Sequence, residues 1–226
     1  MIDKVEFDKE KELIVDSPNF IILVPGAWSV WNNPLNFAAG ETVARENLAS
    51  VLMYGSRRDW DAMAVARNEN DVIRAHDGKT YDDELSELRE KIDYVQKTYH
   101  PKNLFISGRS FGGGLAALVS GDKIPNLSKV LLVSPQIDVD NAIDHPNIYQ
   151  NFPHVTEFLR AISGYRGELT IVHGNRDRVV GFEQSSKLYE AAKTRDLKRL
   201  VLLRTDHGFS NAAELYAKEH LTAFGK

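Results

Sequence analysis

The chain of 226 residues contains no cysteine. This absence excludes disulfide bonds, thiolate-bound metals and a thiol nucleophile, and it is compatible with a reducing compartment. Long apolar runs are missing too, because no segment approaches the roughly 18 consecutive apolar residues of a membrane-spanning helix. The first residues, Met1 to Asp8, lack the basic and then apolar layout of a signal peptide. We therefore expect a cytoplasmic protein that has no membrane partner.

An excess of positive charge is also lacking. The 28 lysines and arginines are outnumbered by 32 aspartates and glutamates, which gives a net charge of −4. The basic pairs Arg57-Arg58 and Lys198-Arg199 are too sparse to follow a phosphate backbone, so we expect no nucleic-acid partner. The sequence has no dinucleotide-binding glycine pattern, and the glycines of segment 112–114 are not followed by the lysine of a phosphate-binding loop. We expect no cofactor.

What the chain does contain is an alternation of apolar runs and helical patterns. Hydrophobic residues make up 42% and charged residues 27%, which is ordinary for a soluble globular protein of one domain. A continuous apolar run such as Phe20–Val24 is typical of a parallel strand that is buried on both faces. Further runs of this kind cover 49–54, 104–106, 130–133, 169–173 and 200–203.

Helical patterns separate these runs. They cover about 37–46, a segment from 80 to the His100-Pro101 stop, 113–119 and 182–192. Thr80 and Asp83 fit a capping box at the start of the longest of these helices. Two short segments, 4–7 and 13–16, predict an opening hairpin, whereas 55–79 are polar and give no assignment. The alternation predicts one α/β domain over 1–226, with a mostly parallel twisted sheet of about seven to eight strands and helices on both faces.

A glycine-flanked serine follows the apolar run 104–106. Gly108-Arg109-Ser110-Phe111-Gly112 has the pattern G-x-S-x-G, and a helix of small residues comes directly after it. In a strand-to-helix turn this pattern is a nucleophile elbow, which exposes the serine hydroxyl above a helix N-terminus. The sequence therefore identifies Ser110 as a candidate nucleophile.

A serine hydroxyl needs a base and an acid that orients the base. Asp177 lies in the turn that leaves the run 169–173, and we select it as the acid. His207 lies in the loop that follows the run 200–203, and we select it as the base. The order serine, acid, histidine is that of the hydrolases that carry this elbow. His173, at the end of a strand, is interpreted as a packed or supporting residue.

These three segments give the whole chain a resemblance to compact members of the α/β-hydrolase superfamily, of the esterase and dienelactone-hydrolase kind. The resemblance is carried by the Ser110 elbow, the turn from Gly174 to Asp177 and the Asp-His-Gly-Phe loop at His207. It implies an oxyanion hole made by two backbone N–H groups. Phe111 is one expected donor and Ala27 the other.

Two residues are candidates for the second donor, since many relatives have His-Gly where this chain has Pro25-Gly26. Trp28 is therefore the alternative to Ala27. Trp28 and Trp31 are also expected to bind substrate, with Phe111 as a further wall of an acyl pocket. The resemblance implies a short lid within 136–167, containing one amphipathic helix.

Two other acidic sites compete with this assignment. Asp138 and Asp140 follow the run 130–133, where some relatives place the acid. The same aspartates, with Asp144, His145 and His154, do not have the spacing of a metal site, so we expect a polar surface there and no metal. Asp206 is expected to bond within its own loop.

The sequence thus predicts a serine hydrolase that cleaves small to medium carboxylic esters or thioesters through an acyl-enzyme on Ser110. The expected partner is a small-molecule ester, and the sequence leaves the oligomeric state open. Acyl transfer, perhydrolysis or peptide cleavage by the same three residues remain alternatives, as does a non-catalytic binding protein built on this scaffold.

Overall fold

Eight strands form one sheet in the order β1-β2-β4-β3-β5-β6-β7-β8. The computed structural model describes residues 3–7, 10–27, 34–54, 78–139, 149–194, 198–210 and 212–225. β2 runs antiparallel to both β1 and β4, and the other neighbouring strands are parallel. The expected mostly parallel sheet is confirmed. The strands are β1 (Asp3–Phe7), β2 (Glu10–Ile14), β3 (Asn19–Val24), β4 (Ser50–Met53), β5 (Asn103–Arg109), β6 (Leu127–Val133), β7 (Glu168–Gly174) and β8 (Lys198–Leu203).

The second strand of the opening hairpin begins earlier than the sequence suggests. It starts at Glu10, so the charged residues before Leu13 belong to the strand and not to the turn. Glu12 is almost completely buried there, and its carboxylate accepts a hydrogen bond from the Tyr99 hydroxyl. A tyrosine 87 residues away along the chain therefore provides a hydrogen-bond partner for this buried carboxyl group.

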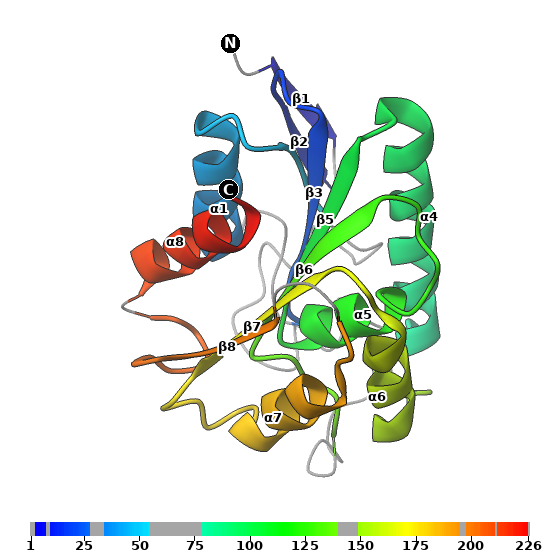
Figure 1. The fold of residues 1–226 in the computed structure, drawn as a ribbon, viewed down its shortest axis with the longest axis vertical. Coiled ribbons are helices and arrows are strands. Elements are labelled where there is room, and N and C mark those ends of the chain that lie inside the picture. The colour runs from blue at the N-terminus through cyan, green and yellow to red at the C-terminus, as the bar shows by residue number, and fades with distance from the viewer. Residues whose placement is uncertain are drawn as a thin grey trace.

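Helices cover both faces of the sheet (Figure 1). α1 (Pro34–Arg45) and α8 (Ala213–Phe224) pack together on one face. The other face carries α4 (Tyr81–Tyr99), α5 (Phe111–Val119), α6 (Val155–Gly164) and α7 (Phe182–Ala191). Two separate apolar clusters, one on each face, form the core.

Local sequence signals account for the longest helix. The Thr80 hydroxyl accepts from the Asp83 N–H, and the Asp83 carboxylate accepts from the Thr80 N–H, which completes the expected capping box. At the other end His100 adopts a left-handed conformation, with φ of 46°, directly before Pro101. The helix buries its apolar face, including Leu88, against the sheet.

The expected lid range, 136–167, is too long. From Val155 onward this range forms α6, whose Phe158 and Ile162 side chains are completely buried in the core, so it connects β6 to β7 as a core helix. Residues 140–148 of the range lie outside the described residues. Among the described residues, α6 therefore belongs to the core and not to a lid.

No helix among the described residues is long and apolar enough to cross a membrane.

A buried histidine ties α8 to the central strand β5. The Nδ1 of His220 lies 2.8 Å from the Tyr216 carbonyl oxygen, and its Nε2 lies 2.8 Å from the Ser107 hydroxyl. Because a carbonyl only accepts, Nδ1 carries the proton and Ser107 donates to Nε2. Burial lowers the pKa of His220 to about 4. The ring is therefore held neutral in the folded protein.

This neutral histidine makes stability depend on pH. The pKa in the folded state is below the ordinary 6.5, so the unfolded chain binds more protons between these two values. The free energy of unfolding should be largest above pH 6.5 and fall as the pH drops toward 4, with up to about 3 kcal/mol due to this group. Urea unfolding at several pH values measures it.

The control is the double variant Ser107→Ala/His220→Leu, which removes the titrating ring and leaves no unpaired serine beside it. Its unfolding free energy should depend less steeply on pH between 6.5 and 4. Some slope will remain, because burial also lowers the pKa of His173. Equal slopes in the two proteins would contradict a neutral, buried His220.

Candidate active site

Ser110 occupies a strained turn between β5 and α5. Its φ of 53° and ψ of −121° lie in a region that residues with a side chain rarely adopt. The turn is closed by glycines on both sides. A Cβ on Gly108 would lie 2.2 Å from the Gly112 carbonyl oxygen, and a Cβ on Gly112 would lie 2.3 Å from the Pro25 carbonyl oxygen. Only glycine fits at either position, which is the physical reason for the G-x-S-x-G pattern.

The structure brings Asp177, His207 and Ser110 together, with the His207 ring between the other two side chains. The Nδ1 of His207 is 2.7 Å from Asp177 Oδ2, and its Nε2 is 3.0 Å from the Ser110 hydroxyl oxygen. A carboxylate only accepts, so Nδ1 carries the ring proton in this pair. Nε2 of the neutral ring is then the acceptor that faces the serine O–H.

The Asp177 carboxylate is held at both of its oxygens. While Oδ2 faces His207, Oδ1 accepts the backbone N–H groups of Val179 and Val180, each at 2.9 Å. Burial alone would raise the pKa of Asp177, but the hydrogen bond and charge of His207, together with these two N–H donors, outweigh burial and lower it. The group is an anion with a fixed orientation.

Adjacent strands place Asp177 and His207 beside each other. Asp177 follows β7, His207 follows β8, and the two turns are joined by backbone hydrogen bonds. The Asn175 N–H donates to the Leu203 carbonyl at 2.8 Å, and the Arg176 N–H donates to the Thr205 carbonyl at 3.0 Å. The two turns therefore form one connected layer at the carboxyl edge of the sheet.

Arg109 joins the loop of His207 to the elbow. It is not among the residues predicted from the sequence. Its side chain is largely buried, and its Nη1 donates to the His207 carbonyl oxygen at 3.2 Å. The only sequence signal is its position, directly before Ser110 in the variable place of the motif. That place says nothing of a partner 98 residues away.

The loop expected to complete an oxyanion hole lies against the nucleophile. A Cβ on Gly26 would be 3.3 Å from the Ser110 Cβ, so the backbone that leads into Ala27 passes beside the serine. Phe111 is the first residue of α5, and a helix offers its first N–H groups no acceptor. Both expected donors thus belong to backbone that adjoins Ser110. Trp28, the alternative donor, lies outside the described residues.

The expectation that Phe111 walls an acyl pocket is wrong. Its side chain is completely buried, and its ring packs edge-on against Tyr81 and Tyr149 at centroid distances of 5.0 and 5.7 Å. The turn points this side chain into the core while it leaves the backbone N–H at the helix start. Trp28 and Trp31, the expected substrate residues, both lie outside the described residues.

The competing acidic residues are engaged elsewhere. The Asp138 carboxylate is 4.0 Å from Lys187 Nζ, and its backbone N–H donates to the Gln184 side chain. Asp206 accepts from the backbone N–H and hydroxyl of Ser210, as expected of a group that bonds within its own loop. Asp140 lies outside the described residues.

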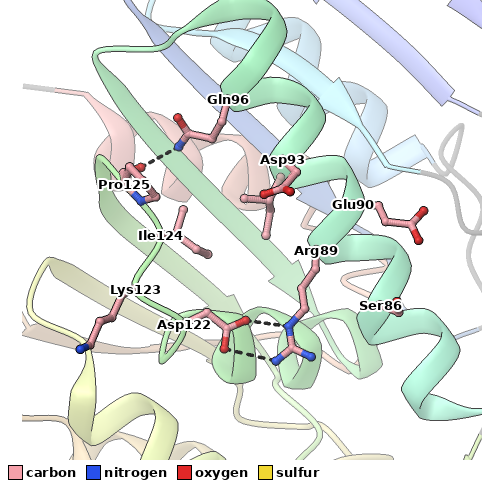
Figure 2. Close-up of a pocket in the computed structure, with 10 residues that line it drawn as sticks. Ser86, Arg89, Glu90, Asp93, Gln96, Asp122, Lys123, Ile124 and Pro125 are labelled. Carbon is pink, nitrogen blue, oxygen red and sulfur yellow. Dashed lines mark hydrogen bonds and ion pairs between the residues drawn. The ribbon is translucent and has the colours of Figure 1, made fainter.

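The described residues give this site no metal cluster, and a groove found among them lies elsewhere. Among the described residues there is no group of three or more His, Asp or Glu side chains that could hold a metal ion. A groove of about 390 Å³ lies on the face of the sheet that carries α4, between this helix and residues 122–125. Arg89 pairs with Asp122 there at 2.7 Å (Figure 2). None of its lining residues belongs to the Ser110 site.

No protein-family model matches the chain, and no curated protein sequence matches it. Solved structures do match over nearly its full length. Est1E from Butyrivibrio proteoclasticus has a TM-score of 0.69 at 18% identity, covering 100% of this chain and 99% of that chain. A dienelactone hydrolase from Anabaena variabilis has a TM-score of 0.70 at 16% identity, covering 99% and 95%. The esterase Pf2001 from Pyrococcus furiosus has a TM-score of 0.70 at 16% identity, covering 98% and 90%.

The strand order, the serine elbow and this full-length likeness lead to one conclusion: the chain has the α/β-hydrolase fold.

Proposed function

We propose that this protein is a serine hydrolase that cleaves small to medium carboxylic esters or thioesters through an acyl-enzyme on Ser110. One observation carries the proposal. His207 lies between a carboxylate and a serine hydroxyl, with Nδ1 2.7 Å from Asp177 and Nε2 3.0 Å from Ser110. This is the arrangement of nucleophile, base and orienting acid that acyl transfer requires.

In the acylation step, the Ser110 oxygen attacks the ester carbonyl carbon while its proton passes to Nε2 of His207. The ring becomes an imidazolium, and the Asp177 carboxylate beside Nδ1 stabilises that charge. When the tetrahedral intermediate collapses, the carbon–oxygen bond of the leaving alcohol breaks and the alkoxide takes the proton from Nε2. The acyl group remains on Ser110 as an ester.

In the deacylation step, water attacks the acyl-enzyme and gives its proton to Nε2 of His207. The second tetrahedral intermediate collapses, the bond to Ser110 breaks, and the serine oxygen recovers the proton. The carboxylic acid product leaves. Since each step returns the ring to its neutral form, no added cofactor enters the cycle.

The negative oxygen of each intermediate needs donors that are in place before the reaction. We assign this role to the backbone N–H groups of Phe111 and Ala27. The α5 N-terminus adds a positive partial charge at the same point. Loss of one such donor costs on the order of 3 kcal/mol of transition-state stabilisation.

The solved structures of similar fold favour an ester as the substrate. Pf2001 is an esterase by its title, the Anabaena variabilis protein is a dienelactone hydrolase, and Est1E has been solved with ferulic acid bound. At 16–18% identity these proteins support the reaction class and leave the acyl group open. We infer the small-to-medium size of the acyl group from the chain length, because α6 belongs to the core and leaves fewer residues of the segment 136–167 to roof the site.

Ser110→Ala should abolish turnover of nitrophenyl esters while the protein stays folded. A fluorophosphonate probe should add one label to the wild type and none to the variant, as detected by intact mass. The matched control is Ser210→Ala, which should keep the label. It removes a hydroxyl in the loop of His207 that, in the described structure, bonds only to Asp206. Turnover near the wild-type rate in Ser110→Ala would refute the mechanism.

Asp177→Asn should lower kcat by several orders of magnitude, because the amide no longer fixes Nδ1 as the protonated nitrogen of His207. Asp138→Asn is the matched control, since Asp138 pairs with Lys187 and should leave kcat close to that of the wild type. Circular dichroism checks that both variants are folded. A greater loss of kcat in Asp138→Asn would move the acid to the end of β6.

Catalytic efficiency should rise from acetyl to butyryl or hexanoyl nitrophenyl esters and then fall for longer chains. Each methylene that is fully removed from water contributes about 0.8 kcal/mol, until the narrow site is full. A feruloyl ester belongs in the same panel, because of the ferulic acid bound to Est1E. Palmitoyl esters that are preferred above their micellar threshold would indicate a lipase and overturn the size argument.

A further inference from the structure

A second histidine lies behind the acid of the proposed site. His173 is the penultimate residue of β7, four positions before Asp177, and its side chain is completely buried. Its Nε2 is 3.7 Å from Asp177 Oδ2, the same oxygen that faces His207. The proposed mechanism uses His207 and leaves this ring without a role.

The hydrogen bonds of His173 define its tautomer. Nε2 lies 3.1 Å from the Val180 carbonyl oxygen, which can only accept, so Nε2 carries the proton. Nδ1 lies 2.8 Å from the Ser185 hydroxyl, on α7. Burial lowers the pKa of His173. The carboxylates of Asp177 and Glu183 act in the opposite direction, and the charge of His207 acts in the same direction as burial. The ring is therefore neutral, Ser185 donates to Nδ1, and the contact with Asp177 is not an ion pair.

The Val180 residue links this ring to the acid. Its carbonyl accepts from His173 Nε2, and its N–H donates to Asp177 Oδ1 at 2.9 Å. Val179 donates to the same carboxylate oxygen. One backbone segment is thus held by the histidine on one side and holds the carboxylate on the other.

We propose that His173 is a positioning residue for the hydrolytic reaction: through Val180 it fixes the Asp177 carboxylate in the orientation that faces His207. The role rests on the proposed function. A chain of hydrogen bonds carries this role. It runs from Ser185 on α7 to the ring on β7 and on to the turn after β7. His173 itself touches neither substrate nor the reacting atoms.

The replacement of His173 by Phe keeps a ring of similar size and removes both hydrogen bonds. The Val180 segment should loosen, and a misplaced acid lowers kcat by about 10- to 100-fold with KM little changed. His173→Gln can place an N–H near the position of Nε2, so it should recover most of the lost kcat. A purely structural role would lower stability without this split between the two variants.

The spectroscopic signature is the low-field proton resonance of His207 Nδ1–H, which reports the hydrogen bond to Asp177 without any substrate. It should be present in the wild type and in His173→Gln, and broadened or lost in His173→Phe. The matched control is His220→Phe, which removes another buried, neutral histidine with two hydrogen bonds. That variant should lose stability and keep the resonance.

If His173→Phe does not fold, Ser185→Ala carries the test. It removes only the donor to Nδ1, and it should broaden the resonance and lower kcat by a smaller factor. A sharp resonance and wild-type kcat in either folded variant would overturn the proposal. If the wild type cleaves no ester while the resonance still responds to His173, the proposed function fails and the positioning role stands.

Discussion

The hydrogen bond between Asp177 and His207 is the interaction on which the chemistry of this site depends. It fixes which ring nitrogen carries the proton, and only that tautomer offers Nε2 as an acceptor to Ser110. The bond exists because β7 and β8 are parallel neighbours, so their carboxyl ends deliver both side chains to the same edge of the sheet. Backbone hydrogen bonds between the two turns then keep the pair in place.

Ser110, the proposed nucleophile, is positioned by a different constraint, which is steric. Ser110 has a positive φ that costs on the order of 1–3 kcal/mol, so the surrounding structure must enforce it. The enforcement comes from close backbone approach, since Gly108 and Gly112 each lie where a Cβ would collide with a carbonyl oxygen. Backbone hydrogen bonds from Ser110 to Val133 and from Gln136 to Ser110 add β6 to this frame. Asp177 and His207 are held by polar contacts, whereas Ser110 is held by close backbone packing together with backbone hydrogen bonds.

The parts of the site that are encoded locally could be predicted from the sequence. The elbow, the Asp177 turn and the His207 loop each follow an apolar strand, and strand ends are readable from short segments. The contacts that support them could not be read in this way. Arg109 reaches a carbonyl 98 residues away, and Ser107 pairs with His220 across 113 residues, so no local pattern reveals either partner.

The orientation of Phe111 escaped prediction for a related reason. The motif specifies the backbone at the elbow, while the direction of the side chain is decided by the aromatic cluster of Tyr81 and Tyr149 in the core. The lid range was overestimated because an amphipathic helix that covers an active site and one that covers a sheet have the same apolar period. Burial of Phe158 and Ile162 distinguishes them, and burial is a property of the fold.

Three histidines in this molecule show how environment assigns function to one residue type. His173 and His220 are completely buried, each has one nitrogen beside a backbone carbonyl and the other beside a serine hydroxyl, and burial lowers the pKa of both. His207 also has a serine at one nitrogen, but its other nitrogen faces a carboxylate, and its side chain remains 17% exposed. Burial holds His173 and His220 neutral, whereas an anion beside a ring can stabilise its positive form. Of these three rings, only His207 therefore has both the exposure and the charge partner that the proposed proton transfer requires.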